Sequence, residues 1–191
     1  MVLDRTRAEA QRLGAATAVV TFDRHPAAVV RPESAPKLLT SLDHKLELLE
    51  AAGIDYTYVV HFDDVRAHES ADHFVTDVLV NSLRVRCVIV GSDFHFGRGR
   101  AGNLALLAQL GRVHHFEAIG IDLLGDDTAA KVVSSTEIRG AIAAGEVERA
   151  AALLGRWHEL RGEVQGGDQR GRTIGFPTAN VAVAGEMALP A

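Results

Sequence analysis

Residues 133–139 place three consecutive hydroxyl side chains and an arginine where a helix is expected to begin. Free backbone N–H groups and the helix dipole favour an anion at such a point, so Ser134, Ser135 and Thr136 could bind phosphate. Arg139 follows Thr136 by one helical turn and could reach the same group. Ser134 followed by Glu137 also fits a plain capping box. The residues alone leave both interpretations open.

A glycine-rich loop, GSDFHFGRGRAG at residues 91–102, follows an expected strand and carries two phenylalanines and two arginines. An aromatic ring could stack on Phe94 or Phe96, and the arginines could bind phosphate. The loop contains a literal G-x-G-x-x-G, but the dinucleotide-binding pattern requires its first glycine directly at the strand end. A loop whose phenylalanines pack into the core is the alternative.

The hexapeptide TFDRHP at residues 21–26 ends another expected strand, where Pro26 restricts the backbone of His25. An ordinary turn explains it equally well. Farther along, residues 162–180 contain five glycines that allow close approach to a ligand. Thr178 and Asn180 offer the hard oxygen atoms that Mg²⁺ and phosphate prefer, while a set of hairpin turns is the alternative.

Other candidates for chemistry are weaker. Cys87 lies in an apolar strand and is expected to be an inert core residue. His114 and His115 are expected on a strand, where adjacent side chains point to opposite faces and cannot share a metal. His61 lies near Asp63 and Asp64 and could form a cation site, although solvated turn carboxylates are much more common.

The elements that position these segments alternate between helix and strand. Because strands separated by helices of this length form a parallel sheet, we predict an α/β fold with helices on both faces. Ligands bind such sheets at the carboxyl ends of the strands, where the candidate loops lie. Glycines and short strand-like patches after Trp157 predict the start of a β-barrel. The expected strands are 15–22, 56–62, 85–90 and 113–123, and the expected helices are 3–13, 42–52, 70–82, 103–110, 135–144 and 146–154.

Composition excludes several classes of protein. The 191 residues carry a net charge of -5, so a fold-wide basic surface for nucleic acid is absent. A single cysteine excludes an internal disulfide framework and a multi-cysteine metal site. No apolar run reaches membrane-spanning length, and no signal peptide is recognisable. We expect a cytoplasmic protein that binds small molecules, without nucleic-acid or membrane partners; the sequence does not predict its oligomeric state.

Taken together, four segments resemble the bacterial bifunctional riboflavin kinase/FAD synthetase family. The resemblance implies a Rossmann-like nucleotidyltransferase domain over residues 1–155, which would transfer AMP from ATP to FMN and give FAD and pyrophosphate. It also implies the start of a riboflavin kinase β-barrel over residues 156–191, which would phosphorylate riboflavin with ATP and Mg²⁺. The segments are TFDRHP (21–26), VGSDFHFGRGRAGN (90–103), VSSTEIRGAI (133–142) and GDQRGRTIGFPTAN (167–180).

The resemblance also implies roles for particular residues. ATP phosphates would lie on Ser134, Ser135, Thr136 and Arg139, and Mg²⁺ on Thr178 and Asn180. The flavin and nucleotide would contact Phe22, Asp23, His25, Pro26, Gly91, Asp93, Phe94, Phe96 and Gly97. In the kinase part, ATP would contact Gly162, Gly167, Gly175 and Pro177.

The sequence departs from the family pattern at both ends. The family's G-x-F-D-G-x-H-x-G-H motif, the strand that carries it and the glutamate expected as the kinase general base are absent, so we assign no catalytic residue. We therefore expect a fragment truncated at both ends, with little or no transferase activity. The alternatives are a non-catalytic flavin- or nucleotide-binding remnant, and an adenylyltransferase for a pantetheine- or nicotinate-type substrate, which the tail at 167–180 disfavours.

Overall fold

The computed structural model describes residues 1–122, 133–166, 175 and 178–191. The chain forms two compact units: residues 1–36 with 45–132, and residues 37–44 with 133–191. Helix α3 (Leu42–Ala51) begins in the second unit and ends in the first. Its start is capped as expected, because the hydroxyl of Ser41 accepts the N–H of His44 at 3.2 Å.

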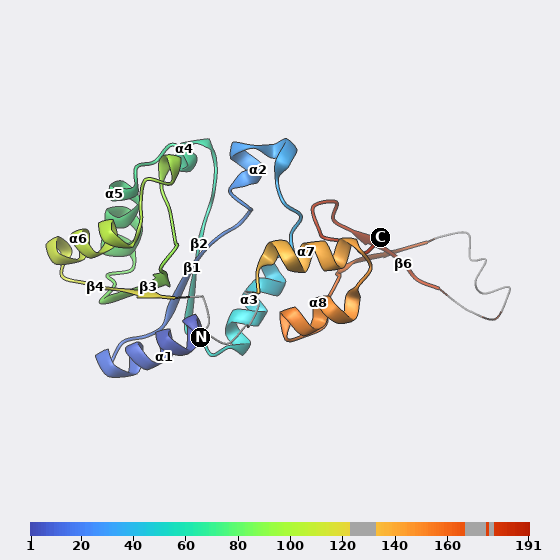
Figure 1. Cartoon of the computed structure of the whole chain (residues 1–191), viewed down its shortest axis with the longest axis horizontal. Coiled ribbons are helices and arrows are strands. Elements are labelled where there is room, and N and C mark those ends of the chain that lie inside the picture. Colours follow the sequence, from blue (N-terminus) through green and yellow to red (C-terminus); the bar gives the residue numbers. More distant parts are fainter. Residues whose placement is uncertain (123–132, 167–174, 176–177) are drawn as a thin grey trace. The chain divides into compact units, whose positions relative to one another are not determined.

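The first unit contains two pairs of parallel strands (Figure 1). Strand β1 (Ala18–Phe22) pairs with β2 (Tyr56–Val60), and β3 (Cys87–Gly91) pairs with β4 (Glu117–Ile121). Parallel pairing of these strands agrees with the prediction. The single sheet does not: in the described part of this unit, each pair forms a separate two-stranded sheet, because no ladder of hydrogen bonds joins β1 to β3.

Helices of the first unit follow the expected order. The expected helix 70–82 is found as a short α-helical turn continued by a π-helix, in which Leu83 N–H bonds back to Val78 O at 3.0 Å. The helices of this unit besides α3 are α1 (Val2–Leu13), α2 (Ala27–Val30), η1 (Pro32–Ser34), α4 (Asp64–Ala67), α5 (Ala71–Phe74), η2 (Val75–Ser82), η3 (Arg98–Arg100) and α6 (Leu104–His114).

One hydrophobic cluster packs against both sheets of the first unit. Val75 and Val78 of η2 and Leu107 of α6 are almost completely buried at its centre. Half-buried residues of all four strands pack around them, namely Val20, Tyr58, Val88, Val90 and Ala118. The helical layer formed by η2 and α6 therefore packs against β1, β2 and β3, whose carboxyl ends lead into the candidate loops.

The prediction for His114 and His115 is wrong. Helix α6 continues to His114, and His115 closes it in a left-handed conformation with φ 62°. Phe116 N–H bonds to Gly111 O at 3.0 Å, which ends the helix and starts the strand four residues later than expected. The alternation of side chains along a strand does not apply to these two histidines.

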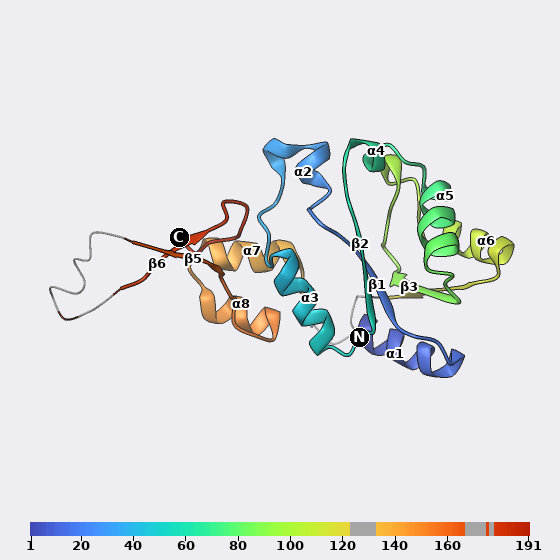
Figure 2. The same cartoon turned by 180° about the vertical axis from the view of Figure 1, so that it is seen from behind.

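The second unit combines two helices with an antiparallel strand pair (Figure 2). Helices α7 (Ser135–Ala143) and α8 (Val147–Leu154) match their predicted positions and bury Ile142 and Ala150 between them. Strand β5 (Gly162–Gln165) pairs with β6 (Asn180–Val183). Strands were expected here, whereas the barrel stays a prediction. Among the described residues, no helix is both long and apolar enough to span a membrane.

Candidate functional site

Asp23 joins the carboxyl ends of β1 and β2 in the first unit. One carboxylate oxygen accepts the backbone N–H of Phe62 at 3.0 Å, and the other accepts from Nδ1 of His61 at 2.7 Å. These bonds, chiefly the one from Phe62, lower the pKa of Asp23 to about 2, and Arg24 adds to the effect. Asp23 is therefore an ionised acceptor that orients the ring of His61.

A lysine from α3 contacts the strand end that leads into the same turn. Nζ of Lys45 donates to the hydroxyl of Thr21 at 3.2 Å and to the carbonyl of Phe22 at 3.3 Å. Burial lowers the pKa of Lys45, and the negative charge of Asp23 opposes that shift. Sequence reasoning missed Lys45, because nothing in the spacing of α3 indicates that this residue meets the end of β1.

The ring of His25 supports the turn itself. Its Nδ1 accepts the backbone N–H of Ala27 at 3.1 Å, while Pro26 starts the short helix α2. Phe22 makes an edge-to-face contact with Phe62, with ring centroids 5.0 Å apart. The structure thus brings Phe22, Asp23, His25 and Pro26 together in one turn at the carboxyl end of β1.

The glycine-rich loop folds back on itself as a small hairpin. Backbone bonds of 3.1 and 2.8 Å join Phe96 to Gly102, and Arg98 N–H bonds to Glu69 O at 2.8 Å. Gly97 has φ +71°, and a Cβ there would lie 2.7 Å from the backbone of Ala71. Only glycine fits this close approach between the loop and α5.

The two phenylalanines of the loop have different environments. Phe96 packs against the core cluster and lies 5.9 Å from Phe74, whereas Phe94 stacks on Phe96 at 5.6 Å and is 42% exposed. The core-packing interpretation therefore suits Phe96, and the stacking interpretation suits Phe94. Gly91 is the last residue of β3, and Asp93 is exposed in the turn that follows.

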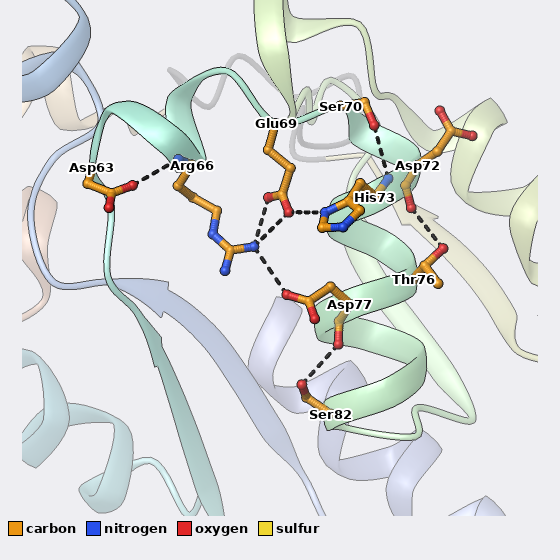
Figure 3. Close-up of polar contacts among 9 residues, drawn as sticks. All are labelled: Asp63, Arg66, Glu69, Ser70, Asp72, His73, Thr76, Asp77 and Ser82. Carbon is orange, nitrogen blue, oxygen red and sulfur yellow. Dashed lines mark hydrogen bonds and ion pairs between the residues drawn. The ribbon is translucent and has the colours of Figure 1, made fainter.

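A polar depression of about 680 Å³ lies beyond the carboxyl end of β2. Asp63 caps α4 by accepting the N–H of Arg66 at 2.9 Å, which lowers the pKa of Asp63. Nη1 of Arg66 binds both oxygens of Glu69 at 2.8 Å and Asp77 at 3.4 Å, and Glu69 chiefly raises the pKa of Arg66 (Figure 3). The lining residues are His61, Asp63, Val65, Arg66, Glu69, Ser70, His73 and Asp77.

The predicted ATP-phosphate residues lie in the second unit, at the start of α7. The hydroxyl of Ser134 accepts the N–H of Glu137 at 3.1 Å, so it caps the helix, and Ser135 and Thr136 are exposed in the first turn. Nε of Arg139 donates to the carbonyl of Lys37, and burial lowers the pKa of Arg139. The same guanidinium lines a pocket of about 290 Å³ beside Met187 and Leu189.

Strands β5 and β6 carry two of the described residues of the predicted kinase site, Gly162 and Asn180. A Cβ on Gly162 would lie 2.0 Å from Ala182 O, so strand pairing accounts for this glycine. Asn180 pairs with Gln165 at one end of the ladder, Thr178 is exposed beside it, and Gly175 has φ +78°. Two predicted residues, Gly167 and Pro177, lie outside the described residues. No group of three metal-ligating His, Cys, Asp or Glu side chains occurs among the residues described.

The chain is similar to proteins of flavin metabolism over most of its length. A relative from Escherichia coli (strain K12), described as a bifunctional riboflavin kinase/FMN adenylyltransferase, is 39% identical over 163 residues, covering 85% of this chain and 51% of the relative. A relative of the same description from Listeria monocytogenes is 39% identical, covering 99% of this chain and 59% of the relative.

A solved structure, described as a macrolide-efflux protein from Streptococcus pneumoniae, superposes with a TM-score of 0.82 and 27% identity over 100% of this chain and 61% of its own. The chain thus spans little more than half the length of the curated relatives it matches. Residues 154–191 match the family model for riboflavin kinase. Residues 1–137 match the family model for FAD synthetase, and the chain belongs to that family.

Proposed function

We propose that this chain is part of an enzyme that makes FAD by transferring AMP from ATP to the phosphate of FMN, with release of pyrophosphate. In the same protein, the part beginning near residue 156 would phosphorylate riboflavin to FMN with ATP and Mg²⁺. The family matches over residues 1–137 and 154–191 and the descriptions of the relatives support these two activities.

The observation that carries the proposal is the arrangement at the strand ends of the first unit. The turn at Asp23 places Arg24, and helix α3 places the ammonium of Lys45, at the end of β1, where they could attract phosphate. Phe94 offers an exposed aromatic face after β3 on which a flavin or adenine ring could stack. Phosphate and a planar ring are the two recognisable parts of FMN and of ATP.

Within this proposal, the residues keep the roles that the resemblance implies. The first unit would bind flavin and nucleotide through Phe22, Asp23, His25, Pro26, Gly91, Asp93, Phe94, Phe96 and Gly97. Ser134, Ser135, Thr136 and Arg139 would bind ATP phosphates, and Gly162, Gly167, Gly175 and Pro177 would cover the kinase nucleotide.

The hydroxyl of Thr178 and the amide oxygen of Asn180 are hard donors, both exposed, and they fit Mg²⁺. Bound there, the ion would neutralise charge on the ATP phosphates. Thr178 and Asn180 would hold it at one end of the β5–β6 ladder.

We also propose a further parallel strand that hydrogen-bonds to both β1 and β3. The two sheets already share one helical layer, so such a strand would join them into a single doubly wound sheet. Residues 156–191 would supply the first strands of the kinase barrel, next to a nucleotidyltransferase domain over residues 1–155.

Titration of flavin fluorescence tests the proposal. We expect the 191-residue chain to quench FMN fluorescence on binding and Phe94→Ala to weaken that binding about tenfold, because stacking on an exposed ring is lost. Chromatography after incubation with ATP and FMN should detect little FAD, because no His-x-Gly-His occurs in the sequence. A flat titration with FMN and with ATP would overturn the proposal.

A further inference from the structure

The depression beyond β2 has the wrong character for a flavin or adenine ring. Its volume of about 680 Å³ lies within the range of small-molecule sites. Sites for aromatic rings are lined mainly by apolar side chains, whereas Val65 is the one apolar residue among the lining. A ligand group that fits here must be rich in hydrogen-bonding atoms.

The charge of the depression disfavours phosphate. Asp63, Glu69 and Asp77 against the single guanidinium of Arg66 leave a net charge of −2 when the two histidines are neutral. An anion would be repelled, because like charges at this range raise its free energy of binding. The remaining class is a neutral group with several donors and acceptors.

Two imidazoles in the depression are held in place by carboxylates. Asp23 binds Nδ1 of His61 at 2.7 Å. Glu69 binds Nδ1 of His73, as Figure 3 shows. Both imidazoles are otherwise open to solvent, with side-chain exposures of 65% and 69%. With Nδ1 occupied, each ring has Nε2 as its second polar atom, and pre-orientation lowers the entropy cost of using it.

The geometry points to a binding site for the vicinal hydroxyls of a sugar or sugar-alcohol chain, and we propose that role for it. Nε2 of His61 and of His73 accepts from ligand hydroxyls, and the Asp77 carboxylate, 46% exposed, accepts as well, as carboxylates do with ribose hydroxyls elsewhere. The inference rests on the proposed function, in which two ligands carry such groups: the ribityl chain of the flavin and the ribose of ATP.

Paired ligands that differ only in the hydroxyl chain test the site. Riboflavin is compared with lumiflavin by fluorescence titration, and adenosine with adenine by calorimetry, on the full 191-residue chain. The double variant His61→Ala/His73→Ala should weaken one hydroxyl-bearing ligand at least tenfold, the loss expected for hydrogen bonds to oriented side chains. The matching ligand without hydroxyls should bind unchanged.

The source of the hydroxyls follows from which pair responds. A loss confined to riboflavin assigns the ribityl chain, and a loss confined to adenosine assigns the ribose. His68→Ala is the matched control, because His68 lies in the same segment, bonds to Asp64 O at 2.7 Å and does not line the depression. It should leave all four affinities unchanged.

Three results would overturn the site. If the double variant binds every ligand as the unaltered chain does, the polar network only stabilises the fold, and the proposed function survives. An equal loss for ligands with and without hydroxyls points to general damage, which a lowered melting temperature would reveal. If the unaltered chain binds none of the ligands, the site and the proposed function fail together.

Discussion

Asp23 shows how one carboxylate can have both a structural and a chemical role. It accepts from the backbone of Phe62 and from the ring of His61, so it connects two parallel strands and orients a solvent-facing imidazole. Its position after an expected strand was readable from the sequence. Its partner was not, because the sequence does not fix which strand lies beside β1, and His61 was interpreted with Asp63 and Asp64 instead.

Asp23→Asn should make the chain less stable near neutral pH. A pKa lowered to about 2 means that the carboxylate stabilises the fold above the unfolded-state value near 3.8 and loses this effect as the pH falls through 2. We expect a loss of about 1 kcal/mol at pH 7, after allowance for solvent screening. Urea unfolding of both proteins should show the difference shrinking between pH 4 and pH 2; a gap that does not change with pH would contradict this account.

At the scale of elements, the alternation of helices and strands was predictable and the details of their ends were not. Apolar periodicity located α3, α7 and α8 within a residue or two. The end of α6 depends on the local bond from Phe116 N–H to Gly111 O around the left-handed His115, and no glycine or proline marks that turn in the sequence. The conversion of 75–82 into a π-helix likewise leaves no periodic signal in so short a segment.

Gly97→Ala should destabilise the first unit by about 2 kcal/mol or more, because the new Cβ would meet the backbone of Ala71 in a left-handed conformation. Gly99→Ala is the matched control, with φ +63° and nothing within 4 Å of its Cβ. It should cost about 1 kcal/mol from conformation alone. Equal losses in chemical denaturation would show that the contact with α5 is unimportant.

Capping of α7 and phosphate binding can be separated by two serine variants. Ser134→Ala removes the bond from Glu137 and should lower the free energy of unfolding of the second unit by about 1 kcal/mol. In the unaltered chain the Ser134 hydroxyl can donate to a phosphate while it accepts from the helix, so its removal should weaken ATP binding as well. Ser135→Ala should weaken ATP binding alone. Thermal melts with and without ATP measure both effects; unchanged affinity in both variants would leave the capping box as the whole explanation.

At the scale of the whole molecule, the two sheets of the first unit pack on one core cluster, so another strand would have to pair with both β1 and β3 to join them. The parallel class of the sheet came from the sequence pattern, whereas its division into pairs became visible only in the strand order. The proposed ATP-phosphate, flavin and kinase residues were identified by resemblance. Spacing alone left an alternative open for each segment.

Fusion of a segment with the family's G-x-F-D-G-x-H-x-G-H motif before residue 1 should produce FAD from FMN and ATP. The added strand would pair with β1 and β3. Its histidines would stabilise the charge that develops in the transition state, and loss of such stabilisation lowers the rate by orders of magnitude. The control is the same fusion with both histidines of His-x-Gly-His changed to alanine. Chromatography of samples taken over time should show faster FAD formation by the fusion with intact histidines. Equal rates would exclude these histidines as the source of activity.

Leu38 and Met187 form an isolated parallel bridge in the second unit, and this pairing has a consequence for the order of events during synthesis. Leu38 N–H bonds to Glu186 O at 2.7 Å, Ala188 N–H bonds to Leu38 O at 2.8 Å, and Lys37 bonds to Gly185 O, 148 positions away. As the polypeptide leaves the ribosome, residues 37–44 cannot bond to these partners until nearly 150 further residues have been synthesised. Parallel pairs β1–β2 and β3–β4 close over far shorter stretches of chain. The first unit should therefore gain protease resistance on the ribosome while residues 37–44 are still cleavable.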